Sequence, residues 1–229
     1  YSFPLGITVP ALLRALARGM SGLNLVTIPE GLTMSEVSLL LSNHLGVPVA
    51  NYTDAESAGQ VLIREAALSM SGVEPSELTT AIDGCSAPTF RMPLRGLATA
   101  FARVSNPGSL ATSRRAACER MLEAVAARPV LIAGSRERIC TDIARATQGR
   151  VFPKIGGDAV YGIGVRGQDR GLAIKMDDGS NRCLHAVLVA LLRRFRFATE
   201  PELASLAGWE QRSLRNWAGI EVGRTEVLV

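Results

Sequence analysis

Aromatic residues are scarce in this chain of 229 residues, making up 5% of it, and the formal net charge is a modest +4. Proteins that bind nucleic acids usually present a basic stripe interleaved with aromatic side chains on which bases stack. The densest basic cluster, residues 193–196, is typical of a helix end, where cations interact favourably with the helix dipole. The sequence therefore argues against nucleic acid as a partner.

Long hydrophobic runs are also missing. The longest apolar run, residues 186–192, is far shorter than the roughly 20 residues that span a bilayer, so we expect no membrane span. No signal peptide is recognised at the start, although the chain begins with Tyr1 rather than Met.

Close cysteine pairs are absent as well. The four cysteines lie far apart and form no CxxC or similar metal-ligand pair: Cys85, Cys118, Cys140 and Cys183. We expect reduced thiols and a cytoplasmic location.

Helical periodicity dominates the middle of the chain. Apolar residues recur at spacings of three and four, and we predict helices over residues 53–71, 94–106, 110–127 and 135–147. The first of these helices is predicted to open with a capping box formed by Thr53 and Glu56 and to stop at Gly72.

The periodicity changes after residue 150. Three short strands joined by glycine-rich turns are predicted over residues 151–155, 159–165 and 171–176. Further helices are predicted over residues 183–196 and 201–208. Helices, then an antiparallel β-meander, then a C-terminal helix predict an α+β fold.

A short connector, residues 83–90, carries unusual chemistry. Asp83 and Cys85 stand two residues apart, where Gly84 permits a sharp bend and Pro88 favours an extended Ala87. One interpretation is a tight turn with a buried cysteine, since free cysteine mostly behaves as a small hydrophobe. The other is a loop that carries polar chemistry.

Residues 1–43 predict a small α/β segment with two helices and a strand at residues 25–28. They resemble a segment of the endolytic murein transglycosylase family, in which this stretch is a small module beside the catalytic domain. Glu30 is interpreted as a turn residue, because no stretch matching the family's catalytic glutamate is found. The matching pieces are Tyr1-x-Phe3-Pro4-x-Gly6, Leu12-Leu13-x-x-Leu16-x-x-Gly19 and Val26-Thr27-Ile28-Pro29-Glu30-Gly31-x-Thr33.

Residues 44–229 resemble a second family, the asparaginase II-like or rhizobial-type L-asparaginases. The resemblance implies a fold similar to serine β-lactamases and glutaminases, and hydrolysis of L-asparagine to L-aspartate and ammonia. The most specific matching pieces are Asp83-Gly84-Cys85-Ser86-Ala87-Pro88-Thr89-Phe90, Lys154-Ile155-Gly156-Gly157-Asp158 and Leu214-Arg215-Asn216-Trp217-x-Gly219-x-x-Val222-Gly223.

This resemblance implies roles for five residues. Cys85 matches a zinc ligand, Asp83 an acid beside the site, and Lys154 the lysine of a Ser–Lys pair at the start of a strand. Gly156 and Gly157 would let substrate lie against the exposed strand edge, and a homodimer is a candidate assembly.

The chain also departs from the family. The family's first zinc cysteine and zinc lysine would fall at residues 31–34, which read Gly-Leu-Thr-Met, and no Ser-x-x-Lys occurs in the chain. A zinc site with Cys85 as its one protein ligand would be incomplete, since zinc sites need three or four ligands. We therefore expect an amidohydrolase whose active site is incomplete. The alternatives are a non-catalytic remnant or interaction module and, less favoured, a fragment of a cell-wall transglycosylase.

Overall fold

The computed structural model describes residues 36, 39–40, 42–43, 49–83, 88–210 and 213–228, with the backbone alone described for residues 49–58. The chain divides into two compact units. Unit 1 contains residues 1–66 and 78–91, and unit 2 contains residues 67–77 and 92–229. The predicted domain boundary at residue 43 stays a prediction.

A β-hairpin is the sheet structure of the described part of unit 1. Strand β1 (Thr79–Ile82) pairs antiparallel with β2 (Pro88–Arg91), and Thr80 lies opposite Phe90. Helix α3 (Val49–Ser71) precedes the hairpin in the chain. The connector that was predicted to extend to residue 90 is therefore corrected, because its last residues form a strand.

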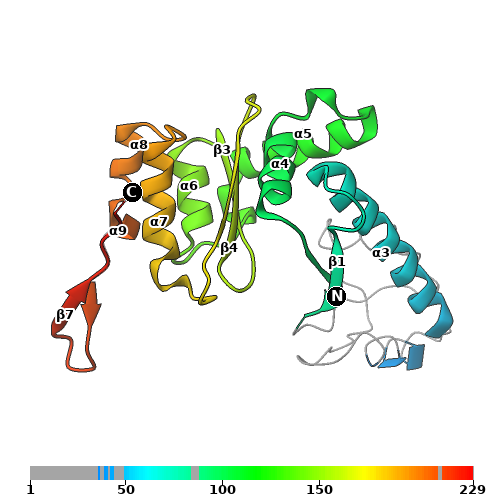
Figure 1. Ribbon diagram of the computed structural model, residues 1–229, viewed down its shortest axis with the longest axis horizontal. Coiled ribbons are helices and arrows are strands. Elements are labelled where there is room, and N and C mark those ends of the chain that lie inside the picture. The colour runs from blue at the N-terminus through cyan, green and yellow to red at the C-terminus, as the bar shows by residue number, and fades with distance from the viewer. Residues whose placement is uncertain are drawn as a thin grey trace, which may run out of the picture. The chain divides into compact units, whose positions relative to one another are not determined.

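Unit 2 is built on a three-stranded antiparallel sheet in the order β3-β4-β5, which confirms the α+β class and the β-meander (Figure 1). The strands are β3 (Val151–Ile155), β4 (Val160–Val165) and β5 (Gly171–Lys175). The helices are α4 (Leu94–Ser105), α5 (Thr112–Ala127), α6 (Ile139–Ala146), α7 (Asn181–Arg194), α8 (Glu200–Ala204) and α9 (Ala207–Glu210).

Short elements complete the described part of unit 2. Two 3-10 turns lie at Pro107–Ser109 and Pro129–Leu131. A second hairpin, β6 (Ser213–Arg215) with β7 (Glu221–Arg224), follows α9, and every residue of its strands is exposed.

Helix α4 packs on one face of the sheet, where glycines replace side chains. A Cβ atom added to Gly162 would overlap the ring of Phe101, and one added to Gly171 would overlap the backbone of α4 at Ala98 and Ala102. The absence of side chains at these glycines therefore lets α4 approach the strands closely.

Helices α6 and α7 cover the opposite face and enclose the main core. Strand side chains at alternate positions point into this core, as the two-residue period of a β-strand requires. Its fully buried large side chains include Ile143, Tyr161, Ile163, Leu184 and Leu188. The sheet thus lies between two layers of helices (Figure 1).

Several predicted boundaries are wrong. The helix predicted from Thr53 begins at Val49, and the helix predicted over residues 183–196 is α7, which begins earlier because Ser180 caps it. The helix predicted over residues 135–147 begins at Ile139. Before it the backbone turns, with φ of 47° at Glu137, and the Thr141 hydroxyl donates to Gly134 O at 2.7 Å.

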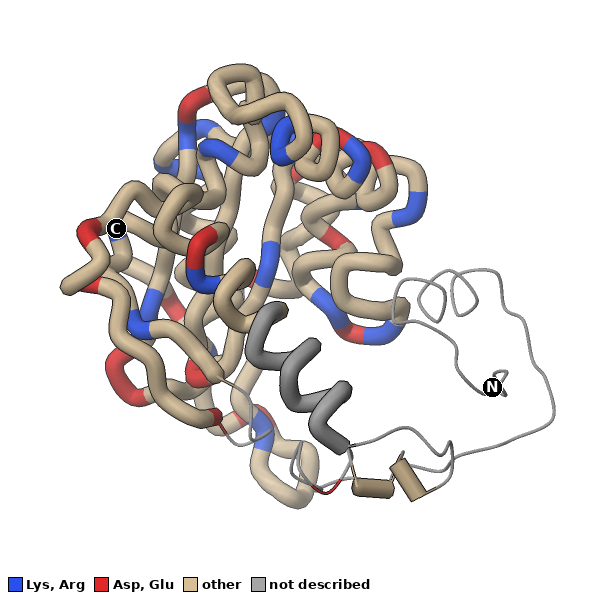
Figure 2. The backbone as a smooth tube through the Cα atoms, turned by 90° about the vertical axis from the view of Figure 1, so that its right-hand side faces the viewer, with Lys and Arg blue, Asp and Glu red and all other residues tan. Residues whose placement is uncertain are grey.

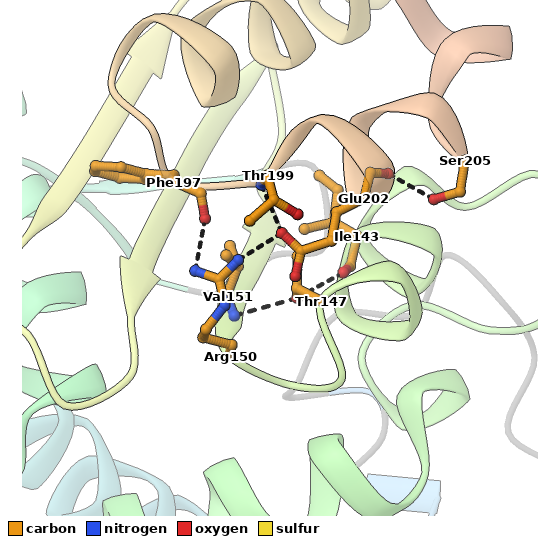
Figure 3. Close-up of polar contacts among 8 residues, drawn as sticks. All are labelled: Ile143, Thr147, Arg150, Val151, Phe197, Thr199, Glu202 and Ser205. Atoms are coloured by element: carbon orange, nitrogen blue, oxygen red, sulfur yellow. Dashed lines mark hydrogen bonds and ion pairs between the residues drawn. The ribbon is translucent and has the colours of Figure 1, made fainter.

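Arginines gather where β3 begins, β4 ends and β5 begins, and we call this the arginine end of the sheet: Arg150, Arg166 and Arg170. Arg150 donates to Phe197 O at 2.9 Å and to the Glu202 carboxylate at 2.6 Å (Figure 3). The same carboxylate accepts the backbone N–H of Thr199 at 2.6 Å, which forms the capping box of α8. The Arg170 guanidinium donates to Phe195 O and lies 4.4 Å from the ring centroid of Phe197. These contacts fasten the segment after α7 to the sheet.

Candidate functional site

Lys154 lies at the opposite end of the sheet from these arginines. It is the fourth residue of β3, an outer strand of the sheet, and its side chain is exposed. Its Nζ donates to Ile155 O at 2.8 Å, so the ammonium group is directed toward the C-terminal end of the strand. The residues before it, Val151 to Pro153, are buried and hold the strand in place.

Gly156 and Gly157 form the turn that follows Lys154. The Gly156 N–H donates to Val160 O at 2.8 Å, and the Val160 N–H donates to Gly157 O at 3.1 Å. A Cβ atom added to Gly157 would meet no atom within 4 Å. The structure therefore brings three of the five predicted site residues together on one open, exposed turn.

The other two predicted site residues belong to unit 1. Asp83 directly follows β1 and is exposed. Cys85 lies outside the described residues, so both interpretations of the connector stay predictions.

Lys175 is a residue that the sequence interpretation missed. It ends β5, and the register places Val160 opposite Lys175 and Gly162 between Lys154 and Ala173. Because side chains alternate between the faces of a sheet, Lys154 and Lys175 share the face on which α4 packs. We call the place where β3 and β5 end and β4 begins the lysine end of the sheet. Composition offered the signal, because only two of the 25 Lys and Arg residues are lysines, and both lie here.

Two turns meet at the lysine end. The Met176 N–H donates to Ala159 O at 3.2 Å, which ties the turn after β5 to the turn after β3. Asp158 and Ala159 have φ of 49° and 53°, a region that residues other than glycine rarely adopt. Strained backbone of this kind clusters at functional sites. The exposed carboxylate of Asp158 thus sits at the same end as the two ammonium groups.

The described cysteines are structural. Cys118 and Cys140 are buried, Cys183 is half-buried, and the Tyr161 hydroxyl donates to Cys140 Sγ at 3.0 Å. Burial, with the neighbouring Cys140, raises the pKa of Tyr161 well above its usual value, so the phenol stays protonated. Within the described ranges no three His, Cys, Asp or Glu residues form a metal-binding group.

A hollow of about 520 Å³ lies beside the last turn of α7. Two of the charged side chains that line it form an ion pair with each other. Arg193 donates two hydrogen bonds to the Glu210 carboxylate and also lies 3.6 Å from Glu200. The hydrogen bond to Glu210 is the main reason that the pKa of Arg193 is raised. Because this guanidinium is engaged by two carboxylates, we do not assign the hollow a catalytic role.

Basic and acidic residues are interspersed along the described backbone (Figure 2). None of the helices in the described ranges combines the length and hydropathy of a transmembrane segment.

The described part of unit 2 is thus an α+β structure with a lysine and a glycine turn at an open sheet end. The family model for L-asparaginase II matches residues 37–227. Because this match covers more than half of the chain, the chain belongs to the L-asparaginase II family. No protein with a curated description matches it. The resemblance of residues 1–43 to transglycosylases stays a prediction.

Proposed function

We propose that the protein is an amidohydrolase that converts L-asparagine and water into L-aspartate and ammonia, and the incompleteness of its active site stays a prediction. The family match over residues 37–227 is the observation that carries this proposal. The exposed Lys154, beside an open turn that leaves room for a small substrate, supports it. A fold like that of serine β-lactamases and glutaminases is part of the same proposal.

In the proposed reaction, an oxygen nucleophile attacks the side-chain amide carbonyl, and the carbon–nitrogen bond breaks as ammonia leaves. If the nucleophile is water, L-aspartate forms directly; if it is a hydroxyl, a water molecule then hydrolyses the resulting ester to L-aspartate. Lys154 is the proposed base, which accepts the proton from the attacking oxygen and passes it to the leaving nitrogen. Gly156 and Gly157 are proposed to admit the substrate to the strand edge. The role of Asp83 as an acid stays a prediction.

Zinc does not enter this mechanism. Cys85 alone does not make a zinc site, since three or four ligands are needed, and the described residues supply no group of three. Zinc at Cys85 therefore stays a prediction, and titration of the reduced protein with zinc tests it. Tight stoichiometric binding that Cys85→Ala abolishes would confirm the metal.

Ammonia release from L-asparagine tests the proposed function. We expect release by the wild-type chain and a loss of 100-fold or more in Lys154→Ala, as general acid–base catalysis contributes ~10²–10⁴-fold. Arg166→Ala, which removes an exposed charge at the arginine end, is the matched control and should keep full activity. Equal rates in the wild type and Lys154→Ala would refute the role of the lysine.

A non-catalytic remnant or interaction module is the second candidate, and the lack of a Ser-x-x-Lys sequence in the chain favours it. Binding of L-aspartate without ammonia release would select this candidate. The transglycosylase alternative predicts peptidoglycan binding, which a pull-down on purified sacculi measures. A homodimer and a cytoplasmic location stay predictions, and sedimentation measures the first.

A further inference from the structure

We propose that Lys175 binds the α-carboxylate of the amino-acid ligand while Lys154 works at the side-chain amide of the same molecule. This inference rests on the proposed function for the identity of the ligand. It assigns a binding role to a residue to which the sequence analysis gave none.

The direction of the strands brings the two ammonium groups to one place. Strands β3 and β5 both run antiparallel to β4, so their C-terminal ends lie at the same end of the sheet. Lys154 Nζ donates to Ile155 O, and Lys175 Nζ donates to Met176 O. Each ammonium group therefore reaches toward the lysine end, and the register puts both on the face where α4 packs.

The spacing suits a small amino acid. Lys154 lies level with Ala173, so Lys175 is two residues farther toward the lysine end. With strands ~4.8 Å apart and ~3.4 Å per residue, the Cα atoms of the two lysines stand roughly 12 Å apart, a gap that their long side chains narrow. The two ends of asparagine are ~4 Å apart, and one charge-assisted hydrogen bond of ~2.8 Å at each end extends the span to roughly 10 Å. One ligand can thus contact both lysines at once.

The alternative explanation is that the two lysines prevent the outer strands from pairing with strands of another molecule, as charged residues on edge strands do. An arginine would also place a charge on an outer strand, and this chain uses arginine at all but two of its 25 Lys and Arg positions. Lysine differs from arginine in offering a compact charge with three freely rotating donors. Its restriction to the lysine end favours a role that needs an ammonium group.

An acidic side chain, that of Asp158, lies at the same end of the sheet as the two lysines. Asp158 lies in the strained turn beside Gly179, where a Cβ atom built on the glycine would be 3.8 Å from that of Asp158. A free amino acid carries a carboxylate and an ammonium group on one carbon. Ammonium and carboxylate side chains at one sheet end are complementary to both.

The test compares two substrates and two variants. β-Alaninamide is asparagine without its α-carboxylate, so it keeps the amide and the amino group. We expect Lys175→Ala to raise KM for L-asparagine and Kd for L-aspartate by 10-fold to 100-fold, leaving kcat and the hydrolysis of β-alaninamide unchanged. Arg166→Ala should change none of these values, and the thermal midpoints of both variants should match the wild type.

The outcomes separate this inference from the proposed function. Unchanged KM and Kd in Lys175→Ala, with an active wild type, would overturn the inference alone. An equal loss for both substrates, or a lowered thermal midpoint, would also overturn it, because the role would then be structural. If the wild type releases no ammonia but binds L-aspartate through Lys175, the proposed function fails and the inference stands. No binding by the wild type would overturn both.

Discussion

The two ends of the three-stranded sheet use positive charge in different ways. At the arginine end, Arg150 and Arg170 bind carbonyl oxygens, a carboxylate and an aromatic ring of the segment that follows α7. At the lysine end, Lys154 and Lys175 each donate to the carbonyl of the next residue in the chain. Guanidinium groups thus hold the segment after α7 at one end, while the lysine side chains at the other end are exposed. With the proposed binding role of the lysines, stability and binding would be separated along a single sheet.

The largest expected effect on stability comes from substituting Gly171, with Gly157 as its matched control. Gly171→Ala places a Cβ atom against the backbone of α4 at Ala98, which cannot move without lifting the helix. We expect a loss of about 3 kcal/mol in the free energy of unfolding, measured by urea denaturation.

Gly157→Ala is the matched control at the lysine end, where an added Cβ atom meets nothing. Its free energy of unfolding should stay within about 0.5 kcal/mol of the wild type. Equal destabilisation by the two substitutions would contradict the claim that Gly171 packs closely against α4 while Gly157 lies in an open turn.

Arg150→Ala should have the next largest effect. The substitution removes the donors to Phe197 O and to the Glu202 carboxylate, and charged hydrogen bonds contribute about 1.5–3 kcal/mol. Because Arg150 is partly exposed, we expect about 1.5 kcal/mol, measured by thermal and urea unfolding. The neighbouring Arg166→Ala should change stability little, and a similar loss in both variants would argue against the specific contacts.

Glu202→Gln should produce a smaller, pH-dependent loss. Burial acts to raise the pKa of this carboxyl, but hydrogen bonds from Thr199 and Arg150 outweigh burial and lower it. A carboxyl with a lowered folded pKa stabilises the protein above its unfolded pKa, about 4.3, and loses this contribution as pH falls through the folded pKa.

The difference between wild type and Glu202→Gln should therefore be about 1 kcal/mol at neutral pH and shrink below about pH 4. Urea denaturation at a series of pH values measures it. A difference that stays constant across this range would show that the charge of Glu202 contributes nothing.

Trp217→Ala should have the smallest effect. The side chain stands at the tip of the β6–β7 hairpin and is fully exposed, with a relative exposure of 108%. We expect the free energy of unfolding to change by less than about 0.5 kcal/mol. The fluorescence of the half-buried Trp209 reports the unfolding transition. A loss above about 1 kcal/mol would show that the hairpin supports the sheet.

The helices and strands that bury one face could be predicted from the sequence, because their apolar residues recur with the period of the element. The central strands are an example, because Tyr161 and Ile163 alternate with small residues, and α4 shows a clear apolar stripe. The two hairpins escaped prediction, because every residue of β1, β6 and β7 is exposed and no buried face marks the strand period. Their signals were local, such as Asn216, whose side chain accepts the N–H groups of Ala218 and Ile220.

The candidate site was predictable in part for a similar reason. Lys154 and its glycines are adjacent in sequence, so a motif can place them together. Lys175 joins them through pairing of two outer strands with β4, which sequence spacing alone does not reveal. Its rarity in an arginine-rich chain was the available signal.

The most direct test measures L-aspartate binding and thermal unfolding for the Lys154→Ala/Lys175→Ala double variant beside Arg150→Ala. The account predicts that the double variant loses binding and keeps the wild-type midpoint, while Arg150→Ala keeps binding and unfolds at a lower temperature. A double variant that still binds L-aspartate, or that loses binding because it unfolds, would contradict the separation of the two ends.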